Sequence, residues 1–126
     1  MKFLLDTHAF LWFNQGDPKL SSKARDLIEN PQNEMLVSMA SLWEIAIKNS
    51  LGKMELDNGF EAVMDYVTKN KFELLYITYE HTRQQNQLPF IHKDPFDRMF
   101  VSQALVEEID VISNDEVMDG YFEGGG

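Results

Sequence analysis

Several residue types and patterns are absent from this sequence. It has no cysteine, which excludes disulfide bonds, thiolate nucleophiles and cysteine-ligated zinc, and which favours a reducing compartment. No apolar run approaches the ~20 residues that a membrane-spanning helix needs. The apolar start of the chain is interrupted by Asp6 and is too short for a signal peptide. We therefore expect a cytoplasmic protein that does not enter a membrane.

Basic residues are also scarce. Lys and Arg number 11 against 21 Asp and Glu, which gives a formal net charge of −10. Nucleic-acid binding through general charge attraction is therefore disfavoured. Two routes to a polyanion stay open, namely a local basic patch or cations bound by clustered carboxylates. The acidic surplus also suits a basic protein partner, although solubility alone is its commoner reason.

Internal repeats, low-complexity tracts and linkers are missing as well. The 126 residues, 44% of them apolar, suit one globular domain with a substantial core. We expect this domain to span residues 1–122, and we expect a flexible tail at 123–126.

What the sequence does contain is a regular alternation of apolar runs and helical patterns. The alternation predicts a mostly parallel sheet covered by helices on both faces, a three-layer α/β/α fold. The expected strands cover residues 2–5, 34–38, 72–77 and 109–113. The expected helices cover residues 9–13, 23–30, 41–53, 95–108 and 114–122, with two more opened by Asn58 and Thr78.

Two of these helices carry further local signals. Gly52 is a candidate stop for the helix at 41–53. Apolar residues at helical spacing after Asn58 predict one core-facing stripe. The stripe consists of Phe60, Val63, Met64 and Val67.

Carboxylates stand near the expected carboxyl ends of the strands, where ligand sites of open α/β sheets form. Four are candidates for a functional site, because each lies at a strand end or on a helix that follows a strand. They are Asp6, Glu44, Asp97 and Asp115.

Local structure alone could explain three of these acids. Glu44 stands three residues after Ser41, the spacing of a capping box, and four before a lysine, the spacing of a surface ion pair. Asp97 lies in the first helical turn behind Asp94, where the helix dipole favours an anion. Asp115 could cap the last expected helix itself.

Asp6 lacks such an explanation. It ends an apolar strand near the expected centre of the sheet, and Thr7 could cap the next helix without it. A buried carboxylate needs hydrogen-bond donors, a cation or a proton. If the other three acids surround it, a divalent cation is the natural remedy, and Mg²⁺ or Mn²⁺ suits such oxygen ligands. Sites of this kind hydrolyse phosphodiesters through a metal-activated water.

The three histidines do not show the spacing of a metal site. Carboxylates suffice for metal-assisted hydrolysis, so a histidine nucleophile is not required. We interpret His8, His81 and His92 as surface or core residues, with His92 a minor candidate for contact with substrate.

Four stretches of the chain together carry a family resemblance. They are LLDTHAFLWF, VSMASLWEIAIKNSLGK, HKDPFDRMFVSQA and VISNDEVMDGY. Each is weak alone, but the ordered set extends over essentially the whole chain and is specific. The chain resembles PIN-domain ribonucleases, and most closely the VapC-type toxins of bacterial toxin–antitoxin pairs.

The resemblance implies a role for each acid. The first to fourth family acids correspond to Asp6, Glu44, Asp97 and Asp115. Ser113 stands where many members have threonine, which keeps a hydroxyl. The first and third acids contact the metal most directly, and the others act largely through water. Asp94 then caps its helix, Pro95 sets the helix start, and the helix dipole helps to keep Asp97 ionised.

The resemblance also implies an activity and partners. We expect a Mg²⁺- or Mn²⁺-dependent endoribonuclease that cuts RNA, such as tRNA or another structured RNA. We also expect a homodimer and an antitoxin that holds the enzyme inactive. The candidates for contact with RNA phosphates are Lys48, Lys53, Lys93 and Arg98. The candidates for receiving the antitoxin tail are Trp12 and Trp43.

Two other classes of function stay open. An aspartyl-phosphate phosphatase or receiver domain also places an aspartate after its first strand. However, His8 stands where the phosphatase needs a second aspartate, and VISND offers no lysine for a receiver. A non-catalytic domain of the same fold would use the acids as helix caps and as a metal- or protein-binding surface.

Overall fold

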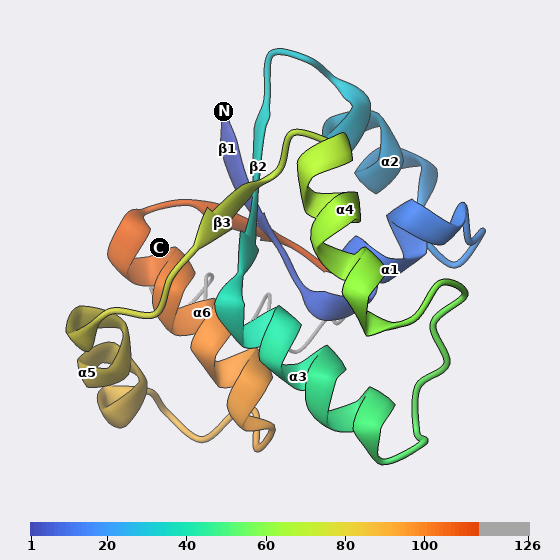
Figure 1. Cartoon of the computed structure of the whole chain (residues 1–126). Helices are drawn as coiled ribbons and strands as arrows, with labels where there is room; N and C mark the ends of the chain where they lie inside the picture. The colour runs from blue at the N-terminus through green and yellow to red at the C-terminus, as the bar shows by residue number, and fades with distance from the viewer. Residues whose placement is uncertain (114–126) are drawn as a thin grey trace.

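A four-stranded parallel sheet forms the centre of the computed structural model (Figure 1). The structure describes residues 1–113, so the expected helix at 114–122, the tail and Asp115 lie outside the described residues. The strands are β1 (Lys2–Leu5), β2 (Glu34–Ser38), β3 (Glu73–Leu75) and β4 (Asp110–Ile112), in the order β3-β2-β1-β4. All three pairings are parallel, which confirms the predicted sheet.

Helices follow or precede every strand. They are α1 (Thr7–Gln15), α2 (Ser22–Glu29), α3 (Met39–Ser50), α4 (Val63–Lys69), α5 (Tyr79–Gln87) and α6 (Pro95–Glu107), with a 3₁₀ turn η1 (Phe60–Ala62) before α4. Within residues 1–113, none of these helices is long and apolar enough to cross a membrane.

The sheet separates two apolar layers, because successive side chains of a strand point to opposite faces. Phe3 and Leu5 face a cluster that α1, α2 and α4 share, whereas Leu4 faces a cluster that includes Phe100 of α6. Figure 1 shows α1, α2 and α4 on one side of the sheet and α5 and α6 on the other. The three-layer α/β/α prediction is therefore confirmed.

The third strand is shorter than the predicted run at 72–77. Its last residue, Leu75, pairs with Ser38, where β2 ends and α3 begins. Beyond that point β3 has no partner strand, so Tyr76 and Ile77 leave the sheet and are exposed.

The prediction around Asn58 is wrong in part. The chain enters α4 through η1 behind Gly59, and neither segment has a side-chain cap. Val63 and Val67 are buried as expected, but Phe60 and Met64 are exposed. The seven-residue α4 packs through one narrow face, and Val63 and Val67 fill it because they are four residues apart.

The stop of α3 is confirmed. Leu51 caps the helix, and Gly52 follows with a φ of 72°. Glycine adopts this left-handed conformation at little cost because it has no Cβ.

Candidate active site

Asp6 lies between the end of β1 and the start of α1, at the carboxyl end of the sheet. Its Oδ1 accepts a hydrogen bond from the Ala9 amide (2.7 Å), and its Oδ2 accepts one from the Ser113 hydroxyl (2.7 Å). The residue is only 4% exposed. Asp6 is thus itself the cap of α1, and the expectation that Thr7 would cap this helix is wrong.

Glu44 is buried in the middle of α3. The helix begins after Ser38, whose side chain caps it, so the capping-box interpretation with Ser41 is wrong. The Thr7 hydroxyl donates to Glu44 Oε1 (2.5 Å), and Lys48 Nζ forms an ion pair with Oε2. Both oxygens of a buried carboxylate therefore have donors. The pairing with Thr7 was not anticipated, because it joins residues 37 positions apart.

Asp97 lies in the first turn of α6. The side chain of Asp94 accepts from the amides of Phe96 (2.8 Å) and Asp97 (3.0 Å), and Pro95 occupies the first helical turn, which confirms the predicted helix start. Asp97 Oδ2 is 3.4 Å from His92 Nδ1, and the Asp97 side chain is 26% exposed. His92 therefore lies beside a candidate acid, a contact that the sequence did not indicate.

The three described acids influence one another electrostatically. Burial raises the pKa of Asp97 to about 6, and the neighbouring charges of Asp94, Glu44 and Asp6 add to this against the opposing effect of His92. Burial also raises the pKa of Asp6, although its bonds to Ala9 and Ser113 oppose the shift. The helix dipole favours the anionic form of Asp97, but burial acts in the opposite direction and raises the pKa of this carboxyl.

The PIN domain family matches residues 3–121. The chain belongs to the PIN domain family. No curated protein matches the chain in sequence. A similar solved structure is VapBC2 from Rickettsia felis bound to a DNA fragment from its promoter, with 16% identity and a TM-score of 0.69. The match covers 96% of this chain and 93% of that one, and at this identity it shows the fold alone.

The acids of this PIN domain fit an open site for a divalent cation. All the candidate donors are carboxylate oxygens, and two of the carboxylates are disfavoured as anions by burial and by their neighbours. In the part of the chain that the structure describes, no group of three or more His, Asp or Glu residues is placed so that it could by itself hold a metal ion. Mg²⁺ commonly binds one or two carboxylates and several waters, which suits this arrangement.

Adding Mg²⁺ or Mn²⁺ should raise the melting temperature of the PIN domain, and the increase should be larger at pH 7 than at pH 5. The cation competes with protons for Asp97, whose pKa is raised to about 6, and for Asp6, whose pKa is raised in the same direction. A cation at 100 times its Kd adds about 2.7 kcal/mol. Thermal unfolding with KCl at matched ionic strength is the control. An equal increase at both pH values would contradict this coupling.

The candidates for phosphate contact differ in their environments. Arg98 is buried and donates to backbone carbonyls, so it is not available to RNA and that expectation is wrong. Lys48 is partly exposed but pairs with Glu44. Lys53 and Lys93 are exposed and remain candidates.

The two tryptophans also differ. Trp43 is 60% exposed and packs edge-on against Phe96, with ring centroids 5.3 Å apart. Trp12 is half-buried, packs against the core and lies 5.4 Å from the His8 ring. Only Trp43 of the two therefore offers a largely open aromatic surface near the acids.

His81 is a core residue, one of the two roles expected for the histidines. It is fully buried and lies 2.8 Å from Glu107 through Nε2, while its Nδ1 accepts from the Thr78 amide at the start of α5. His81 therefore completes a capping box and joins α5 to α6.

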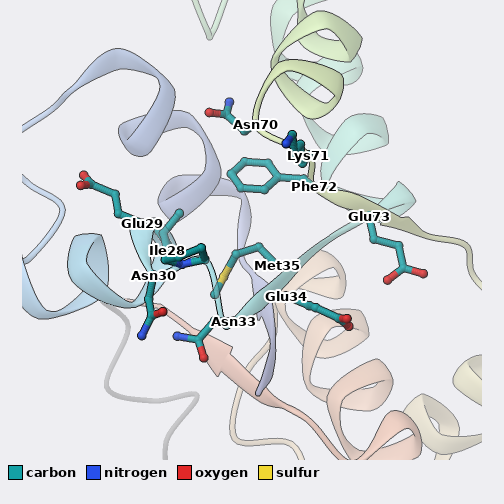
Figure 2. Close-up of a pocket in the computed structure, with 11 residues that line it drawn as sticks. Ile28, Glu29, Asn30, Asn33, Glu34, Met35, Asn70, Lys71, Phe72 and Glu73 are labelled. Carbon is teal, nitrogen blue, oxygen red and sulfur yellow. The ribbon is translucent and has the colours of Figure 1, made fainter.

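A hollow of about 520 Å³ lies at the opposite edge of the sheet, where β2 and β3 begin. Figure 2 shows the residues that line it. Met35 and Phe72 form part of its wall, and none of the three described acids, Asp6, Glu44 and Asp97, lines it. Its carboxamides serve local structure, since Asn33 donates to Leu27 O and Asn70 to Tyr66 O. The hollow is therefore separate from the acidic site.

Proposed function

We propose that this PIN domain is a metal-dependent endoribonuclease that hydrolyses RNA phosphodiesters and acts as the toxin of a toxin–antitoxin pair. The observation that supports it best is the mutual repulsion of Asp6, Glu44 and Asp97 at the carboxyl end of the sheet. Acids from three separate elements share a partly buried region in which two of them are disfavoured as anions. Such a cluster loses stability in the metal-free protein and gains it when a cation binds.

The four acids fall into two pairs in this proposal. Asp6 and Asp97 hold Mg²⁺ or Mn²⁺ most directly, while Glu44 and Asp115 act through water. When bound there, the cation would lower the pKa of a water molecule and would offset negative charge at the reacting phosphate. Ser113 and the Ala9 amide hold the Asp6 carboxylate in one orientation.

Glu44 is held in place from two sides. The Thr7 hydroxyl donates to one oxygen, and Lys48 donates to the other. The hydrogen bond that Lys48 donates to Glu44 raises the pKa of Lys48, so this lysine stays charged at neutral pH. The Glu44 side chain is therefore fixed in one orientation, in which it could orient a water.

The RNA must approach an acidic protein. We propose that Lys53 and Lys93 contact its phosphates, because both are exposed and lie close in sequence to the elements that carry the acids. A homodimer would join two such weakly basic edges into one groove for a structured RNA such as tRNA. A toxin of this kind acts in the cytoplasm.

An antitoxin is the proposed protein partner. The similar structure from Rickettsia felis is a VapBC2 complex, in which a toxin-like fold occurs with its partner. The exposed face of Trp43, beside Phe96, is a suitable contact for an apolar side chain of that partner. Co-expression with the product of an adjacent gene should relieve growth arrest if this pairing is correct.

Cleavage of a structured RNA should require Mg²⁺ or Mn²⁺, and Asp6→Asn should slow it about 10- to 100-fold. Asparagine keeps the Oδ1 that caps α1, so the change removes charge more than structure. Gel assays of product formation, with and without EDTA, measure the effect.

The matched control is Asp65→Asn, because Asp65 is exposed on α4. Its rate should equal that of the unchanged protein. Cleavage that persists in EDTA, or an undiminished rate in Asp6→Asn, would refute the proposed function.

A further inference from the structure

Arg98 is bound to the backbone of the segment that joins α5 to α6. The residue is 7% exposed, and its Nη1 and Nη2 atoms donate to four carbonyl oxygens. The acceptors are Gln85 (3.0 Å), Leu88 (3.4 Å), Pro89 (3.0 Å) and His92 (3.4 Å). The Phe90 ring centroid lies 4.3 Å from Cζ of the same guanidinium. A planar fork of donors can serve several acceptors at once, which a lysine ammonium cannot reproduce.

This bonding matters because the segment 88–94 contains neither helix nor strand. Three of its carbonyl oxygens therefore accept hydrogen bonds from the Arg98 side chain, and not from the backbone of a helix or sheet. The same segment carries His92, whose Nδ1 lies 3.4 Å from Asp97 Oδ2. Arg98 and Asp97 are therefore adjacent in sequence, and both also contact His92 of segment 88–94.

We propose that Arg98 is a positioning residue of the active site, which fixes segment 88–94 and thereby holds His92 against Asp97. The proposal rests on the proposed function in so far as Asp97 is the metal ligand. Asp97 is partly open to solvent, so its carboxylate can rotate unless a neighbour restrains one oxygen. Partners of a metal ligand typically change metal affinity 10- to 100-fold when they are removed.

Two substitutions separate the steps of this connection. Arg98→Lys keeps the positive charge but loses the fork that binds four carbonyls. His92→Asn removes the imidazole beside Asp97 and leaves the bonds of Arg98 in place. Arg25→Lys is the matched control, because Arg25 also lies over a ring, Phe13 at 5.7 Å, and donates to a carbonyl, but it belongs to α2.

The first measurement is chymotrypsin cleavage after Phe90 in the metal-free protein, well below the melting temperature of each variant. Phe90 is highly exposed, so cleavage depends on how firmly the segment is held. We expect Arg98→Lys to be cut at least about tenfold faster. His92→Asn and Arg25→Lys should be cut at the rate of the unchanged protein.

The second measurement is the Kd for Mn²⁺ by calorimetry at pH 8. We expect about tenfold weaker binding in Arg98→Lys and in His92→Asn, and no further loss when both are combined. Arg25→Lys should bind Mn²⁺ normally. A normal Kd in Arg98→Lys despite faster cleavage would show that Arg98 has only a structural role, and additive losses would show that it does not act through His92.

The third measurement distinguishes this inference from the proposed function. In the metal-free protein, Asp97→Asn and Arg98→Lys should displace the same NMR signals of the His92 ring. If the unchanged protein binds no Mn²⁺, the metal site is refuted, and these signals alone decide whether Arg98 holds His92 against Asp97. Ring signals that Arg98→Lys leaves unchanged would overturn the inference.

Discussion

Asp97→Asn should slow RNA cleavage severely and at the same time stabilise the metal-free protein. Loss of a group that stabilises the transition state costs about 10²–10³-fold in rate. The effect should exceed that of Asp6→Asn, because both Asp6 oxygens already accept protein hydrogen bonds whereas Asp97 is more open. Cleavage assays in Mg²⁺ and unfolding in EDTA measure the two halves of the prediction.

The gain in stability follows from the raised pKa of Asp97, about 6 in the folded protein against an ordinary 3.8. A shift of two pKa units corresponds to about 3 kcal/mol. Since a quarter of the side chain is open to solvent, we expect about 1–2 kcal/mol after screening.

The raised pKa also predicts how this gain in stability depends on pH. The folded carboxyl binds its proton more tightly than the unfolded one, so the unchanged protein loses stability relative to Asp97→Asn as pH rises from about 4 to 6. Below pH 4 the Asp97 carboxyl is protonated in both the folded and the unfolded state. The stability gained by Asp97→Asn therefore disappears there. Denaturant titrations at several pH values test this. A constant difference in the free energy of unfolding across the range would contradict it.

Phe100→Ala should destabilise the protein by about 3–5 kcal/mol. Phe100 is fully buried and packs in the cluster that contains Leu4 of β1 and Leu36 of β2. It stands one turn after Asp97 on α6, so the same contact that stabilises the fold holds α6 against the sheet. Activity should therefore fall together with stability. Urea unfolding followed by circular dichroism measures the loss.

A matched substitution tests whether position on α6 matters for function. Phe72→Ala removes a buried phenylalanine from the cluster on the other face of the sheet, away from the candidate acids. It should cost a similar free energy, while Phe60→Ala, at a residue 41% exposed, should cost much less. Rates measured where all variants are folded should be lower in Phe100→Ala than in Phe72→Ala. Equal rates would show that the packing of α6 does not position Asp97.

The sequence predicts the fold well because most of its signals are local. The alternation of apolar runs with helical patterns indicates the parallel sheet, and the Asp94-Pro95 pair indicates where α6 begins. The start of α3 was misplaced because Ser38 and Ser41 are both suitable caps by sequence, and only the end of β2 selects the first. The short β3 likewise depends on its partner strand.

The candidate site is less predictable than the fold, because its details depend on distant pairs. Asp6 was identified as a buried acid, but its bond to Ser113 joins residues 107 positions apart. The interpretation of Arg98 as a surface cation failed because its acceptors are carbonyls of an irregular segment. Sequence periodicity gives no sign of such acceptors.

The order of the strands has a consequence for synthesis on the ribosome. Among the described strands, β1 is synthesised first and β4 last, and β1 lies between β2 and β4 in the sheet. Asp6 receives the hydroxyl of Ser113 only after β4 has taken its place beside β1. A nascent chain therefore carries its first acid long before the sheet that orients it is closed. Under the proposed function, Asp6 would therefore lack its contact with Ser113 until residue 113 has left the ribosome.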